Sequence, residues 1–128
     1  MKSSRKCGGV MKPVGKYQVG RGRTRVRLYV FRGGRDIAAF LDGRGRHLGA
    51  AAVAYPAGKR GVRVRTIGVP GHCEAGLVRD LARSLCLRWQ RVCLVAGGIH
   101  VDRIAPAEIE VIQKNVRRIR TQIEGAQS

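Results

Sequence analysis

The chain contains only three histidines, and each one stands beside a glycine-rich turn. They are His47, His72 and His100, and two acidic residues, Glu74 and Asp102, each follow a histidine by two positions. An imidazole next to a carboxylate can move a proton, hold one tautomer or bind a metal ion. We predict these five residues as the catalytic group, and the three histidines as candidate ligands of a divalent metal ion. The plainer alternative is structural: Asp102 caps the turn before the last helix, and His100 bonds the backbone.

The same turns are rich in glycine and arginine, which suits an anionic ligand. Glycine lets backbone amides approach a ligand closely, and arginine neutralises phosphate. The segment around Gly71 also precedes a predicted helix, whose first amides favour an anion. The predicted cofactor-binding residues are Arg44, Gly45, Arg46, Gly49, Gly71, Gly98 and Arg103. Turns that merely carry basic residues remain the alternative. Motifs of nucleotide-binding proteins and of zinc deaminases are absent from the sequence.

Alternating residues predict the strands that position these turns. From Arg21 to Phe31, arginine alternates with apolar residues, so arginines line one face while Val26, Leu28 and Val30 line the other. The predicted strands are 21–31, 36–41, 47–55, 62–67 and 92–96. We expect residues 97–102 to form a loop. The arginine face meets solvent, a phosphorylated partner or another subunit.

Two segments have the spacing of amphipathic helices. Apolar residues recur from Leu77 to Trp89 and from Ile109 to Ile123, and Pro106 suits the first position of the second helix. The sequence therefore predicts an α+β domain over residues 16–124, with a mainly antiparallel sheet of about five or six strands packed by two amphipathic helices. Residues 1–15 are predicted to be a flexible basic tail.

The net charge of +18 favours polyanions or phosphorylated ligands as partners. Nucleic acid is the less favoured partner, because we expect the strand arginines to lack aromatic neighbours on their own face for base stacking. The four cysteines show no compact spacing and are expected to be reduced. No apolar run suggests a membrane span or a secretory signal, which predicts a cytoplasmic protein.

Three blocks of the sequence resemble the prenylated-flavin chaperone family, LpdD-like, which accompanies UbiD-type decarboxylases and is related in fold to proteasome assembly chaperones. The blocks are residues 45–50, 70–74 and 96–110, and the last, with Gly-Ile-His-Val-Asp before Pro-Ala-Glu-Ile-Glu, is the most specific. The resemblance covers residues 16–122.

The resemblance implies that the protein binds prenylated FMN and supports its delivery to, or oxidative activation in, a UbiD-type decarboxylase. It also implies a flavin prenyltransferase as a possible second partner, and a homodimer. The chain departs from the family's pattern at Cys73, where lysine is common, and at Ala105, where threonine is common and would cap the helix. An assembly chaperone without a ligand and a basic nucleic-acid-binding protein are the alternative functions.

Overall fold

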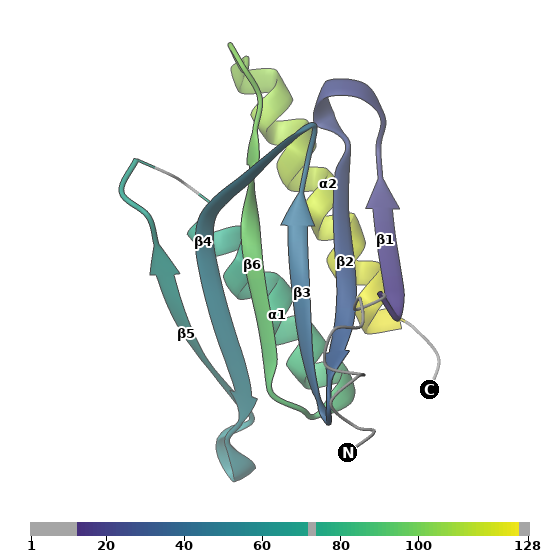
Figure 1. Cartoon of the computed structure of the whole chain (residues 1–128), viewed down its shortest axis with the longest axis vertical. Helices are drawn as coiled ribbons and strands as arrows, with labels where there is room; N and C mark the ends of the chain where they lie inside the picture. Colours follow the sequence, from purple (N-terminus) through teal and green to yellow (C-terminus); the bar gives the residue numbers. More distant parts are fainter. Residues whose placement is uncertain (1–12, 72–73, 126–128) are drawn as a thin grey trace, which may run out of the picture.

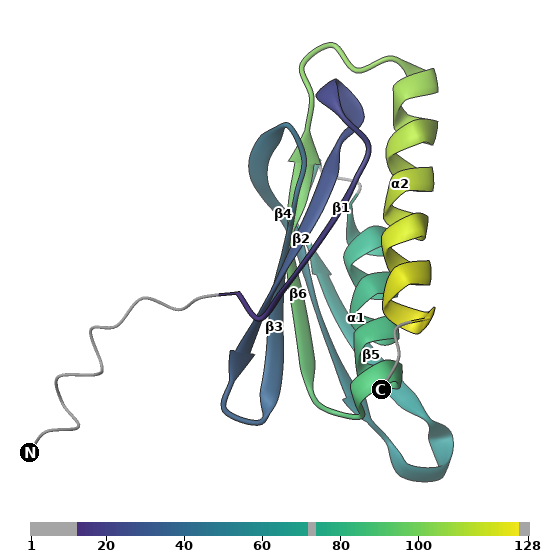
Figure 2. The ribbon, with the colours of Figure 1, turned by 90° about the vertical axis from the view of Figure 1, so that its right-hand side faces the viewer.

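The described part of the chain forms a six-stranded sheet, and two helices cover one face of it, as the arrangement of the ribbons in Figures 1 and 2 shows. A computed structural model describes residues 13–71 and 74–125. The strands are β1 (Gly15–Val19), β2 (Val26–Gly33), β3 (Asp36–Asp42), β4 (Gly45–Pro56), β5 (Val62–Gly68) and β6 (Cys93–His100), and the helices are α1 (Ala75–Trp89) and α2 (Pro106–Gly125). The predicted α+β architecture is confirmed.

The strand order is β1-β2-β3-β6-β4-β5, so the last strand of the sequence lies inside the sheet. Hairpins join β1 to β2, β2 to β3 and β4 to β5, and all of these pairs are antiparallel. β6 runs antiparallel to β4 and parallel to β3. The sheet is therefore mainly antiparallel, as predicted, and β6 carries the third sequence block through its centre.

The core lies between the sheet and the helices. Val26, Leu28 and Val30 of β2 are buried, as their alternation with polar residues predicts. Both helices contribute a buried apolar stripe. Its members are Val78, Leu81 and Leu85 of α1, and Ile112, Val116, Ile119 and Ile123 of α2. The prediction was wrong for Ile109, which is 41% exposed because it lies in the first turn of α2, beyond the edge of the packed core.

The strand expected to begin at Arg21 begins at Val26 instead. Residues Gly22–Thr24 form a short 3-10 helix, which connects β2 to β1, a strand that the pattern did not predict. Gly20 and Gly22 both have positive φ, so they turn the chain where alternation alone suggested that it continues straight. Arg21, Arg23 and Arg25 consequently do not share the strand face of Arg27.

The predicted loop after residue 96 is in fact the second half of β6. Gly97 pairs with Leu41 of β3 and with Ala50 of β4. Its φ is +137°, and a Cβ atom at this position would collide with the Leu41 carbonyl oxygen. The paired glycines looked like a loop signal, but they let two neighbouring strands approach the backbone of β6 closely.

Two of the four cysteines lie in the described part of the chain, and both are core residues. Cys86 and Cys93 are buried and free. Burial raises the pKa of the Cys93 thiol to about 12, so it stays protonated at neutral pH and is a poor nucleophile. None of the described helices is long and apolar enough to cross a membrane.

We predict that Gly97→Ala destabilises the fold by about 3 kcal/mol or more, since it adds a clash with β3 to unfavourable backbone geometry. Gly34→Ala is the matched control: Gly34 also has positive φ, but nothing lies within 4 Å of an added Cβ. Its cost should stay at about 1–2 kcal/mol. Urea denaturation of both variants measures the difference, and equal losses would show that the close approach of β3 does not matter.

Candidate functional site

His47 and His100 lie side by side at one end of the sheet. Their ring centroids are 5.7 Å apart and the rings are tilted by 44°. His100 is the last residue of β6 and pairs with Gly45 of β4, which places His47 diagonally across from it on the same face. A Cβ on Gly98, the residue between them, would lie 3.3 Å from the His47 ring. The missing side chain of Gly98 therefore makes room for this pair.

The three sequence blocks meet at Gly49. The Gly49 carbonyl accepts a hydrogen bond of 2.8 Å from the amide of Val69, the residue immediately before the second block. A Cβ on Gly98, in the third block, would lie 3.1 Å from the Gly49 nitrogen. Gly49 itself is buried and belongs to the first block. The blocks are thus joined through the backbone, which is why the turns they form lie at one end of the molecule.

His100 is paired with Asp102 across the turn that follows β6. His100 Nε2 lies 2.9 Å from Asp102 Oδ1, and both side chains are largely exposed. The Nε2–H tautomer or the imidazolium donates this hydrogen bond, so the carboxylate favours a proton on Nε2. A proton can therefore be exchanged between this pair and a ligand or solvent.

The turn from Val101 to Ala105 is fastened by Arg23, from the far end of the sequence. Arg23 Nε donates to Glu108 Oε2 at 2.8 Å, and an Arg23 terminal nitrogen donates to the Asp102 carbonyl at 2.7 Å. The Glu108 carboxylate also accepts the Ala105 amide at 3.0 Å. Glu108 thus provides one half of a capping box, and the other half, an N-cap side chain that accepts the amide of residue 108, is missing because residue 105 is alanine.

This pairing has a marked electrostatic effect on Glu108. The hydrogen bond from Arg23, followed by the one from the Ala105 amide, lowers the pKa of the Glu108 carboxyl to about 2. The contribution of the pair is therefore complete above the ordinary carboxyl pKa of 4.5 and disappears as the pH falls through about 2. The Arg23–Glu108 ion pair, which holds the turn that carries Asp102, therefore stays intact throughout the physiological pH range.

Arg103 lies in the same turn with an unusual backbone. Its φ is +53°, in the left-handed region, which costs a non-glycine residue about 1–2 kcal/mol. The side chain is exposed beside Asp102. Arg44 is exposed in the turn between β3 and β4, at the same end of the sheet. The Arg46 side chain and the whole of His72 lie outside the described residues.

A groove of about 730 Å³ runs between α1 and α2 and ends at His100. Gly71 and Glu74, which flank the undescribed residues 72 and 73, also line it. Its walls are mostly apolar. The apolar lining residues are Leu77, Leu81, Ile99, Val101, Ile104, Ile109, Ile112 and Val116. A volume of this size and lining is typical of a site for a small organic ligand.

The side of the sheet without helices, which we call the open face, has a second hollow beside His47. Its volume is about 520 Å³, and its lining includes Tyr29, Phe31, Phe40 and Leu48. Arg27 lies 5.6 Å from the centre of the Tyr29 ring, and Phe31 packs edge-on against Phe40. The expectation that the strand arginines lack aromatic neighbours was wrong, since residues 27, 29 and 31 alternate onto one face.

The described residues contain no group of three or more histidine, cysteine or acidic side chains that could hold a metal ion. The predicted metal set includes His72, which lies outside the described part, so that site stays a prediction. The predicted glycines have a packing role: a Cβ on Gly45 would lie 2.7 Å from the His100 carbonyl oxygen. Gly45 and Gly98 therefore let β4 and β6 approach each other closely, whereas a Cβ on Gly71 would have nothing within 4 Å.

Sequence reasoning missed the two residues that fasten the turn and the apolar walls of the groove. Glu108 had a signal, because a glutamate three residues after a helix start is typical of a capping box. Arg23 had none, since its partner is 85 residues away in the sequence. Leu77, Leu81, Ile109, Ile112 and Val116 of the groove were assigned to the buried stripes of the two helices, and Ile99 and Val101 to a loop. Leu77 is half-buried and Ile109 is exposed, because both lie near the starts of their helices.

A comparison with models of protein families agrees with the resemblance carried by the sequence blocks. The model of the prenylated flavin chaperone LpdD-like domain matches residues 20–127. Among solved structures, the chain is similar to one chain of a chaperone complex for yeast 20S proteasome assembly, with 14% identity, a TM-score of 0.47, and coverage of 88% of this chain and 98% of that chain. A search of curated protein sequences gives no match.

We predict that Arg23→Gln raises the pKa of the Glu108 carboxyl from about 2 towards its ordinary value near 4.5, because it removes the main stabilising donor. An NMR titration of the glutamate side chains measures this shift, and hydrogen exchange at residues 102–106 should become faster in the variant. Arg21→Gln, on the same connection, is the control. An unchanged pKa of Glu108 in Arg23→Gln would contradict the ion pair between Arg23 and Glu108.

Proposed function

The chain belongs to the prenylated flavin chaperone LpdD-like family, and on that premise we propose that it binds prenylated FMN in the groove between α1 and α2. The observation that carries this proposal is the meeting of the three sequence blocks at the end of that groove. Gly71 and Glu74 of the second block and His100 of the third line it directly. His47 of the first block contacts His100.

The lining of the groove fits the parts of such a ligand. The isoalloxazine ring and the prenyl group are largely apolar, and the apolar side chains of α1, β6 and α2 give them a surface that excludes water. The phosphate requires cations and amide donors. Arg117 and Arg120 line the groove itself, and the predicted residues Arg103 and Arg44 are exposed at its His100 end, so these four arginines are the candidates for this role.

His100 and Asp102 can accept a proton from the bound flavin ring or return one to it. When bound, a reduced prenylated flavin supplies the redox chemistry itself. The chain's own contribution is an imidazole held by a carboxylate at 2.9 Å, with a second imidazole, His47, beside it. This pair accepts or returns a proton at the mouth of the groove. We assign His47, His100 and Asp102 to this role, with Glu74 further along the groove wall.

The exposure of the mouth suits transfer to a partner protein. The side chain of His100 is 60% exposed and that of Asp102 is 89% exposed, so an acceptor can approach the ligand without unfolding of the chaperone. We propose that the acceptor is a UbiD-type decarboxylase and that the chain either delivers the cofactor to it or supports its oxidative activation there. A flavin prenyltransferase is the corresponding donor.

Anaerobic titration with reduced prenylated FMN tests the proposal. We expect a changed flavin spectrum on binding and at least about tenfold weaker binding for Arg103→Gly, the loss expected for one charge-assisted hydrogen bond. Glycine also relieves the left-handed backbone at this position, so the variant should be as stable as the parent. The weaker binding therefore cannot come from unfolding.

Arg118→Gln, an exposed arginine of α2 away from the groove lining, is the matched control and should bind as the parent does. An unchanged flavin spectrum at micromolar protein would contradict the proposed function. In that case an assembly chaperone without a small ligand, whose partner pull-down survives loss of the three histidines, becomes the better account.

We further propose that a second copy of the chain covers the open face. The middle of this face consists of small residues, since Ala51 pairs with Ala96, and exposed apolar side chains flank them, with Phe40 42% and Ile67 74% exposed. An exposed row of apolar residues of this kind is typical of a protein–protein contact. Two copies packed through these faces would form a sandwich of two sheets with all four helices outside.

Light scattering during gel filtration tests this assembly. We predict a mass of twice the 14.0 kDa of one chain, and a single-chain mass for Ala51→Arg, which buries a charge in the contact. Arg118→Gln should remain dimeric. A monomeric parent chain would contradict the proposal. If that monomer also bound random single-stranded DNA with an affinity that fell steeply with salt, the arginines and aromatic rings of the open face would serve nucleic acid instead.

A further inference from the structure

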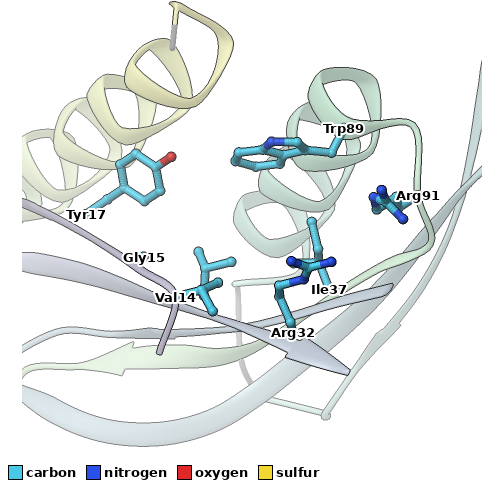
Figure 3. A pocket seen from close by; sticks show the side chains of 8 residues that line it. Val14, Gly15, Tyr17, Arg32, Ile37, Trp89 and Arg91 are labelled. Atoms are coloured by element: carbon cyan, nitrogen blue, oxygen red, sulfur yellow. The ribbon is translucent and has the colours of Figure 1, made fainter. Parts of the chain in front are cut away.

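A separate cavity lies at the opposite end of the helix-covered side of the sheet (Figure 3). It holds about 380 Å³, against about 730 Å³ for the groove. Its lining comes from the start of β1, the end of β2, the start of β3 and the segment after α1. The lining residues are Val14, Gly15, Tyr17, Val30, Arg32, Ile37, Trp89 and Arg91. None of these residues belongs to the three sequence blocks or contacts the histidine pair.

The cavity exists because the helices leave this corner of the sheet uncovered. α1 ends at Trp89, and Gly15 has no side chain to fill the space opposite Val30, its partner on β2. A Cβ on Gly15 would lie 3.7 Å from Val30, which is ordinary contact distance, so nothing forbids a larger residue here. The apolar side chains of Val14, Val30 and Ile37 form the floor of the cavity.

Two aromatic side chains from different elements stand on either side of this floor. Figure 3 shows the Tyr17 ring at one side with its hydroxyl directed towards the cavity, and the Trp89 indole above the space. Burial raises the pKa of the Tyr17 phenol, so its hydroxyl keeps its proton and can donate a hydrogen bond. Flat apolar walls of this kind favour a flat apolar ligand.

The charged side chains that line the cavity are both cationic. Arg32 and Arg91 line it, and no acidic residue does. Arg91 uses one nitrogen to donate to the Arg35 carbonyl at 3.0 Å, which orients its guanidinium. Within the described part of the chain, the Arg32 guanidinium has no acidic partner. A third arginine, Arg88, lies 5.5 Å from the Trp89 ring centre and adds positive potential.

We propose that this cavity is a second binding site, and that it takes a small aromatic carboxylate. The carboxylate would bind Arg32 and Arg91, whose forked donors match its two oxygens, while the ring lies between Tyr17 and Trp89. The volume is near the lower limit for small-molecule sites, which favours a single-ring compound over a flavin. The site does not depend on the proposed function of the groove.

Trp89 is the only tryptophan of the chain, so its fluorescence reports directly on this cavity. Titration of the full chain with benzoate should quench or shift the emission with saturation, whereas benzyl alcohol, which lacks the charge, should not. Arg32→Gln should weaken benzoate binding at least about tenfold, as expected when a charge-assisted hydrogen bond is lost. Arg63→Gln, an exposed arginine of β5, is the control and should leave it unchanged.

Two results would overturn the proposal. One is the absence of a saturable change in Trp89 fluorescence up to millimolar benzoate. The other is equal affinity of the parent chain and Arg32→Gln. His100→Ala separates the two sites: it should leave benzoate binding intact, so that failure of flavin binding in the groove does not count against this cavity. A loss of benzoate binding in His100→Ala would place the carboxylate elsewhere and contradict the assignment.

Discussion

Gly97 and Gly98 have no side chains, and the backbone of β6 therefore approaches β3 on one side and β4 on the other more closely than other residues allow. The Leu41 carbonyl occupies the place of a Cβ on Gly97, and the His47 ring lies against Gly98. Because β6 lies so close to β4 here, the His47 and His100 rings stand side by side at the end of the sheet, with their centroids 5.7 Å apart. Gly45 continues the same packing on β4, and the Gly49 carbonyl accepts a hydrogen bond from the Val69 amide. The histidine pair, the turn after β6 and the end of the groove all depend on it.

The turn after β6 is held from both ends. Strand pairing fixes His100, and the Arg23–Glu108 pair fixes the backbone of Asp102 and the start of α2. Between these anchors, Arg103 keeps a left-handed backbone that a less constrained turn would relax. Strain of this kind persists only where the surroundings impose it, and it is common at binding sites. The arginine excess also has more than one use, since Arg23 and Arg27 make structural ion pairs, Arg32 lines a cavity and Arg103 is exposed to solvent.

Much of the fold followed from periodicity, and much of the site did not. Alternation in β2 and helical spacing in α2 report burial directly, so the sheet, both helices and most of the core could be predicted. The glycines misled in both directions: Gly20 and Gly22 break an apparent strand, whereas Gly97 and Gly98 lie inside one. Whether a glycine serves a turn or a close approach depends on its neighbours in space. The Arg23–Glu108 pair, the groove, the hollow beside His47 and the cavity at Trp89 depend on the same long-range information, and only the resemblance suggested a flavin.

The central claim is that the groove ending at His100 holds the flavin. Hydrogen exchange of the full chain with and without reduced prenylated FMN, followed by mass spectrometry under anaerobic conditions, tests it most directly. The account predicts that the ligand slows exchange in the residues that border the groove, namely 74–81, 99–105 and 109–117. Protection of β2 and β3 on the open face, with the groove segments unchanged, would contradict it and place the ligand in the hollow beside His47.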